Sequence, residues 1–186
     1  MDTVALTVLI VCIAALALIF TAAFVWLRRR SRRLREEFGP EYERTLRQRK
    51  SRNTAERELA DRRRRVRALD IRPLRPEQAD RYREAWLGVQ ARFVDDAQAS
   101  LNDADRLISD VMLARGYPEE EYEQRVKDIS VDHPETVGRY RKAHGIQGAR
   151  SAGRPPQLDQ LRDALLDYRR VFMEMLDDTP ARRQAG

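Results

Sequence analysis

Hydrophobic residues are spread unevenly along the chain, and one long apolar stretch at its start dominates the pattern. Residues 3–27, TVALTVLIVCIAALALIFTAAFVWL, contain no charged side chain. At about 1.5 Å per helical residue, these 25 residues reach roughly 37 Å, which exceeds the roughly 30 Å hydrocarbon core of a bilayer. The pattern therefore predicts a transmembrane helix that anchors the chain over residues 1–27.

Positive charge borders this stretch on its C-terminal side only. Because Lys and Arg remain cytoplasmic, we predict a single-pass protein in the cell membrane, with its N-terminus outside and the bulk of the chain in the cytoplasm. A cleaved secretory signal is the alternative, but it requires a basic start and a shorter apolar core. For the arginines that follow the apolar stretch, we expect either contact with the anionic headgroups of membrane lipid or a role limited to setting the topology. These are Arg28, Arg29, Arg30, Arg32, Arg33 and Arg35.

The next segment, residues 28–75, is strongly basic. Residues 28–67 hold 17 Lys and Arg against 7 Asp and Glu, a net charge of +10, although the whole chain carries only +6. Gly39 and Pro40 predict a break in the helix, because proline cannot donate a backbone hydrogen bond. A long polar helix follows over residues 41–69, with few apolar positions, and indicates an exposed spacer or half of a loose coiled coil. Two prolines then make residues 70–76 a rigid connector.

Helical periodicity returns in residues 76–177, which predict a small cytoplasmic helical bundle. Residues 76–94 and the helix after Asp95 or Asp96 carry apolar residues at alternating spacings of three and four, typical of helices in an antiparallel hairpin. Gly116 is expected to end the second of these helices. The fold class is therefore all-α, with an N-terminal transmembrane helix, a long polar juxtamembrane helix and a helical bundle.

Three more helices complete the predicted bundle. One should open at Pro118, and a second should begin near Asp132 or His133, with Pro134 in its first turn, and end near residues 144–145. A glycine- and proline-rich flexible loop is predicted over residues 145–156. The last helix, over residues 158–176, has a heptad-type apolar seam, and a disordered tail is predicted over residues 178–186.

Two aromatic stripes in the bundle allow two interpretations. Tyr82, Trp86 and Phe93 share one helical face, and Tyr168 and Phe172 lie in the seam of the last helix. Such stripes are either the internal core of the bundle or a surface that binds a protein partner, including a second copy of this chain.

Residues capable of catalysis are sparse. His133 and His144 are about 16 Å apart if they share one helix, which is too far for one metal ion, and a capping role explains Asp132 and His133. Cys12, the only cysteine, lies within the apolar stretch. We therefore predict no enzymatic activity, no cofactor and no metal site.

A second basic run, Arg62 to Arg65, raises nucleic-acid binding as the alternative function. The run lacks interleaved aromatic residues and accompanies no known nucleic-acid motif, so solvated helix surface is the favoured interpretation. Nucleic acid is therefore an unlikely partner. A membrane-tethered nucleic-acid-binding protein remains the second hypothesis.

Several segments resemble a family of small uncharacterised bacterial proteins. They are FGPEYERTL (residues 38–46), RALDIRPL (67–74), ARFVDD (91–96), DRLISDVMLARGYP (105–118) and DISVDHPETVGRYRKAH (128–144). Members share one N-terminal apolar segment, are often named only as hypothetical or secreted proteins, and have no assigned activity. The resemblance covers most of residues 34–176 and implies no reaction. The apolar stretch, the long polar helix and the sparse catalytic residues, rather than this resemblance, favour a membrane-anchored, non-enzymatic adaptor or scaffold at the inner face of a bacterial membrane.

Overall fold

The chain is all-helical in the part that the computed structural model describes, residues 2–149 and 153–177; the side chains of residues 2–12, 14 and 27 are outside this description. Seven helices and no strand occur within these residues, which confirms the predicted all-α class. The helices are α1 (Asp2–Gln48), α2 (Arg52–Arg67), α3 (Pro76–Asp95), α4 (Ala97–Ala114), α5 (Tyr122–Asp132), α6 (Val137–Ala149) and α7 (Leu158–Asp177).

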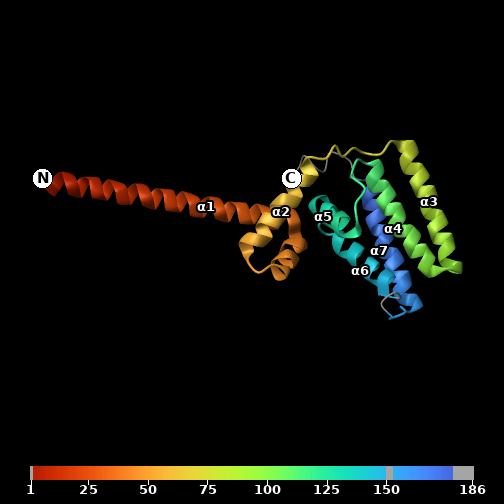
Figure 1. Cartoon of the computed structure of the whole chain (residues 1–186). Coiled ribbons are helices and arrows are strands. Elements are labelled where there is room, and N and C mark those ends of the chain that lie inside the picture. The colour runs from red at the N-terminus through yellow and green to blue at the C-terminus, as the bar shows by residue number, and fades with distance from the viewer. Residues whose placement is uncertain (1, 150–152, 178–186) are drawn as a thin grey trace.

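Helix α1 begins as a rod that projects from the body of the protein (Figure 1). Inside the body it kinks at Gly39, whose φ of 42° and ψ of −124° are not helical, and Pro40 follows. The predicted break at Gly39 and Pro40 is therefore confirmed. The positive φ explains the glycine, because other residues pay a steric cost in this region.

The polar segment after the kink is not one long exposed helix, so the spacer prediction is wrong. Helix α1 ends at Gln48 and α2 begins at Arg52. The Ser51 hydroxyl caps α2 by accepting a hydrogen bond from the Thr54 amide at 3.2 Å. Helix α2 then packs back against α1 (Figure 1). The hairpin buries a small core of Leu34, Phe38, Tyr42, Leu59 and Val66, completed by Val131 of α5.

The remaining helices form the predicted bundle. Helix α4 packs against α3 and α7, and α6 packs against α7, around one continuous core (Figure 1). The α3–α4 hairpin is confirmed, with Asp96 as the cap that accepts from the Ala99 amide at 2.9 Å. Helix α5 contacts both α2 and α6, so it joins the hairpin to the bundle.

The boundaries of α5 and α6 differ from the prediction. Helix α5 begins at Tyr122 rather than Pro118, because the buried Tyr117 holds the preceding chain in place: its amide donates to Met112 O and its hydroxyl to Asp132. Asp132 is thus occupied and caps no helix. His133 is instead the C-cap of α5, and α6 begins only at Val137.

Helix α6 also runs past its predicted end, through Gly145 and Gly148 to Ala149. Gln147 explains the extension, because its carbonyl accepts from Gln98 and its amide donates to Asn102 at 2.8 Å. The flexible-loop prediction is therefore wrong for residues 145–149. Residues 150–152 and the predicted tail, 178–186, lie outside the described residues.

Gly116, predicted to end α4, has a φ of 100° at the turn after that helix, which ends at Ala114. A Cβ at this position would lie 2.4 Å from the carbonyl oxygen of Asp70, in the connector between hairpin and bundle.

We expect Gly116→Ala to lower the free energy of unfolding by about 1–3 kcal/mol, since both the backbone conformation and the close approach disfavour a side chain. Urea unfolding followed by circular dichroism measures this. Gly88→Ala, inside α3 with nothing within 4 Å of the added Cβ, is the matched control. It should be neutral or stabilising by about 0.5–1 kcal/mol, and equal losses in both variants would contradict the argument.

Candidate functional site

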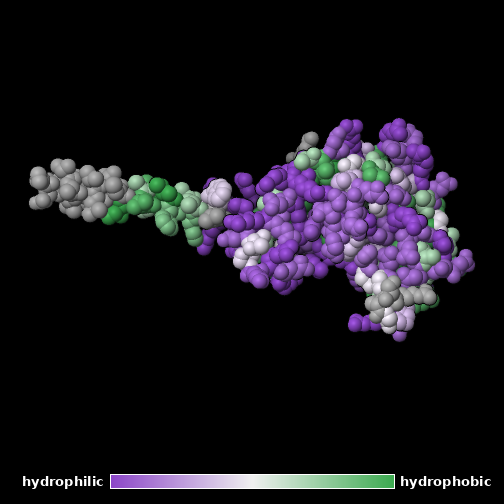
Figure 2. Space-filling model, in the orientation of Figure 1, coloured by the Kyte–Doolittle hydropathy of each residue, from purple (hydrophilic) through white to green (hydrophobic). Residues whose placement is uncertain are grey.

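The projecting part of α1 exposes a dense set of large apolar side chains. Figure 2 shows the coloured part of this segment mostly in green, whereas the visible face of the body is mostly purple. Exposed apolar surface of this extent on a soluble protein normally marks a site of interaction with another molecule. The exposed residues are Ile13, Leu16, Leu18, Ile19, Phe20, Phe24, Val25 and Trp26.

Within the described residues, no helix is long and apolar enough to cross a membrane. The transmembrane assignment of residues 1–27 therefore stays a prediction.

A group of arginines lies along one side of α1 where it enters the body. A cavity of about 640 Å³ is lined there by Phe24, Val25, Arg28, Arg29, Ser31, Arg32, Arg35 and Arg52. We call Arg28, Arg29, Arg32, Arg35 and Arg52 the basic collar. The collar places apolar rings and guanidinium groups side by side, which is the composition that suits the boundary between lipid chains and headgroups.

Aromatic rings and one carboxylate orient several of these arginines. The Arg28 guanidinium lies 4.6 Å from the Phe24 ring centroid, and that of Arg30 lies 5.8 Å from Trp26. Such cation–π contacts are worth about 0.5–1 kcal/mol at exposed sites. Arg35 lies over Tyr42 and pairs with Glu43 at 2.8 Å. Arg30 is half-buried, whereas Arg33 is exposed and does not line the cavity.

Arg52 is the collar residue that sequence reasoning missed. It belongs to the first turn of α2 and reaches the collar only because α2 folds back on α1. Its guanidinium donates to Glu56 at 2.8 Å, and Glu56 also accepts from Ser31 and from the Tyr42 hydroxyl. Burial raises the pKa of Glu56, but these hydrogen bonds outweigh it and leave its pKa below the ordinary value.

The aromatic stripes belong mainly to the core. Trp86, Tyr168 and Phe172 are buried, and the Trp86 and Phe172 rings stack with centroids 4.8 Å apart. Tyr82 and Phe93 are half-buried at the edge of the bundle. The structure therefore supports the core interpretation for Trp86, Tyr168 and Phe172, which are not available as a partner surface.

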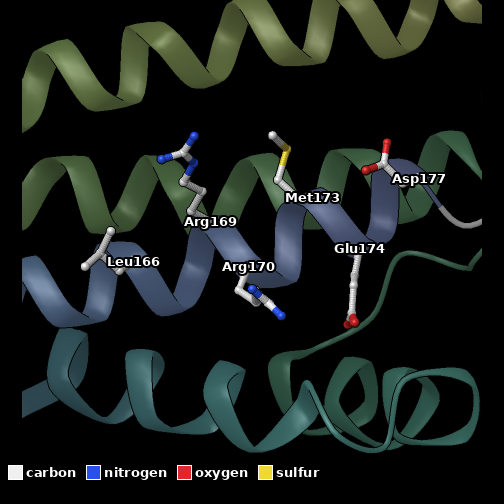
Figure 3. Close-up of a pocket in the computed structure, with 6 residues that line it drawn as sticks. All are labelled: Leu166, Arg169, Arg170, Met173, Glu174 and Asp177. Atoms are coloured by element: carbon white, nitrogen blue, oxygen red, sulfur yellow. The ribbon is translucent and has the colours of Figure 1, made fainter.

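The outer face of α7 forms a shallow cavity of about 480 Å³. Figure 3 shows Arg169, Met173 and Asp177 on one side of the helix and Arg170 and Glu174 on the other. Glu174 already accepts from Thr136, and Asp177 pairs with Arg83 at 3.4 Å. The cavity is lined by two arginines and two acids, so its lining has no net charge, and both acids are already engaged. No charged ligand is therefore favoured here.

The sequence favoured solvated helix surface for the basic run at residues 62–65, and the structure shows that this interpretation is wrong for most of the run. Arg62 is buried and donates to Glu41 at 3.1 Å and to Glu58. Arg63 pairs with Glu37, and Arg65 with Glu120 and Asp128; only Arg64 is largely exposed. Nucleic-acid phosphates would have to displace these carboxylates, which weakens the alternative hypothesis.

The contacts of the two histidines are not typical of a catalytic site. His133 is buried, with Nδ1 3.8 Å from Glu174, and His144 stacks on Tyr122. No three His, Cys, Asp or Glu side chains converge to hold a metal ion anywhere in the described residues. The side chain of Cys12 is outside the description.

Comparisons with known proteins identify no relative: no family model matches the chain, and no curated protein or solved structure is significantly similar to it. The structure itself defines the class, an all-helical protein in which a kinked hairpin with a projecting apolar rod packs on a helical bundle. The resemblance to small bacterial proteins stays a prediction.

Proposed function

We propose that this protein is a membrane-anchored, non-enzymatic adaptor or scaffold at the inner face of a bacterial membrane. One observation carries the proposal: an exposed apolar rod leads directly into the basic collar. The apolar sequence of residues 3–27 is as long as a helix that spans a bilayer. The arginines then lie at the level of the headgroups, where each is worth about 1 kcal/mol near an anionic leaflet.

The orientation follows from the same charges. Arginines close to the end of a membrane helix stay on the cytoplasmic side, so the hairpin and the bundle are cytoplasmic. Because α5 packs on the hairpin, the bundle is held next to the collar rather than on a free tether. A bundle held in this way presents its outer surface to cytoplasmic partners, which is the geometry that an adaptor requires. A second copy of this chain is the alternative partner, since the rod leaves its own apolar surface exposed.

Protease accessibility in bacterial cells tests anchor and orientation together. The full chain should sediment with carbonate-washed membranes, resist protease added to spheroplasts and be cut in inverted vesicles. Replacing the six arginines at residues 28–35 with glutamine should produce a mixed orientation, because the charge bias is then lost.

The matched control replaces six exposed arginines far from the rod and should keep a single orientation. They are Arg64, Arg81, Arg106, Arg162, Arg169 and Arg170. Recovery of a chain outside the cell that lacks its first residues would show a secretory signal and overturn the proposal.

A further inference from the structure

A second basic cavity lies on the seam between the hairpin and the bundle. It measures about 500 Å³ and is enclosed by α1, α2, α5 and α6. Figure 1 shows α5 beside the hairpin, with α6 following it toward α7. We call it the seam cavity. Its lining residues are Arg44, Gln48, Arg49, Glu58, Arg62, Tyr122, Glu123, Val126, Lys127, Arg141, His144 and Gly145.

Part of the cationic lining is fixed in place by carboxylates. Arg141 donates to both oxygens of the buried Glu41, at 2.7 and 2.6 Å, and Arg62 donates to the same carboxylate. Glu58 accepts from both Arg49 and Arg62. Burial raises the pKa of Glu58, but these arginines more than offset it and lower the pKa below its usual value, so Glu58 stays charged near neutral pH. These contacts make one wall of the cavity rigid.

Two cations of the lining have no such partner. Among the described residues, neither Arg44 of α1 nor Lys127 of α5 forms an ion pair or a side-chain hydrogen bond. They come from different elements, Arg44 from the hairpin and Lys127 from α5, the helix that joins the hairpin to the bundle. Five Arg and Lys side chains line the cavity against two acids, Glu58 and Glu123. The seam cavity therefore has an uncompensated positive charge.

An aromatic pair forms the remaining wall. The rings of Tyr122 and His144 stack with centroids 3.5 Å apart and planes 9° apart. Burial raises the pKa of Tyr122 to about 12 and lowers that of His144. Both rings are therefore neutral near pH 7, and the Tyr122 hydroxyl keeps its proton as a hydrogen-bond donor. The charge available to a ligand thus comes from Arg44 and Lys127, with Arg141 and Arg62 behind them.

We propose that the seam cavity binds a small phosphate-bearing anion, as inorganic phosphate or a phosphate monoester. Several cations around one cavity match a dianion better than a single carboxylate, and guanidinium groups suit phosphate oxygens. Because Arg44 belongs to the hairpin and Lys127 to α5, the bound anion bridges the hairpin and the helix that joins it to the bundle. Binding therefore stabilises their packing, as any ligand selective for the native state does. The inference does not depend on membrane anchoring.

Thermal unfolding of the full chain in a non-ionic detergent tests this inference, with inorganic phosphate titrated against chloride at constant ionic strength and neutral pH. Phosphate should raise Tm in a saturable way. Arg44→Gln and Lys127→Gln should each weaken the apparent affinity about tenfold, the effect of one charge-assisted hydrogen bond. Arg47→Gln is the matched control on the same helix, since Arg47 is exposed and outside the cavity, and it should bind as the unsubstituted chain does.

Both test residues lack structural partners, so the variants should fold, which circular dichroism checks. No phosphate-specific rise in Tm, or an equal rise in Arg44→Gln, Lys127→Gln and Arg47→Gln, would overturn the proposal. Nanodiscs identify the source of the phosphate group. If anionic phospholipid abolishes the response of Tm to free phosphate, and Tm in these nanodiscs still depends on Arg44 and Lys127, a lipid headgroup fills the cavity. If the response of Tm to free phosphate is unchanged, the ligand is soluble.

Discussion

Glu41→Gln is expected to lower the free energy of unfolding by about 3–5 kcal/mol, the usual cost of removing one partner from a buried ion pair. Glu41 is 3% exposed and compensates two guanidinium groups, those of Arg62 and Arg141. The variant leaves Arg141 without a carboxylate partner and Arg62 with Glu58 alone, in a site with little access to water. The neutral amide cannot replace the lost attraction. Because these arginines lie on α2 and α6, the seam between hairpin and bundle should weaken first.

Urea unfolding followed by circular dichroism measures the loss, and hydrogen exchange locates it in α1, α2 and α6. Glu36→Gln is the matched control, because Glu36 is exposed on the same helix, and it should change stability by less than about 0.5 kcal/mol. A triple variant separates charge from volume. Glu41→Leu combined with Arg62→Met and Arg141→Met should recover much of the loss, since no uncompensated charge remains. A Glu41→Gln effect as small as that of Glu36→Gln would show that the cluster is not desolvated.

Phe172→Ala is expected to cost about 3–5 kcal/mol of unfolding free energy, the range for truncating a buried aromatic residue. The side chain is fully buried in the C-terminal half of α7 and stacks on Trp86 of α3 with an interplanar angle of 20°. Truncation removes this ring contact and leaves a cavity between α3, α4 and α7 that the surrounding helices fill only in part.

The same unfolding measurement checks this prediction, and Trp86 fluorescence reports the loss of the stacked ring. Phe172→Leu should cost less, because it leaves a smaller cavity. Leu166→Ala, on the exposed face of α7, is the control and should be within about 0.5 kcal/mol of the unsubstituted chain. If Phe172→Ala and Leu166→Ala had similar effects, the assignment of the aromatic stripe to the core would be wrong.

The sequence identified most of the basic collar, but it did not identify Arg52 or the seam cavity. The arginines at residues 28–35 were identified because they directly follow an apolar stretch, and both features are local. Arg52 was missed because it lies 17 positions after Arg35, and only the return of α2 along α1 brings them together. The seam cavity was missed for the same reason, since its lining comes from four helices.

The Arg62 to Arg65 run shows where charge counting fails. Composition indicates how many positive charges a segment carries, but it does not indicate which carboxylates from other helices will neutralise them. Glu37 and Glu41 of α1, together with Glu120 and Asp128 near α5, turn this run into internal contacts. A basic segment that looked solvated is therefore largely part of the packing between two units.

The sequence alone determined the helical class, the kink at Gly39, the α3–α4 hairpin with a cap at Asp95 or Asp96, and the extent of α7. Periodicity, proline, glycine and capping residues act within a few positions of one another, so these features can be read locally. Tertiary structure alone decided that the polar segment folds into a hairpin, that Trp86, Tyr168 and Phe172 face inward, and that Glu41 joins α2 to α6. The physical reason is that burial and ion pairing depend on which surfaces meet, and residues distant in sequence supply the opposing surface.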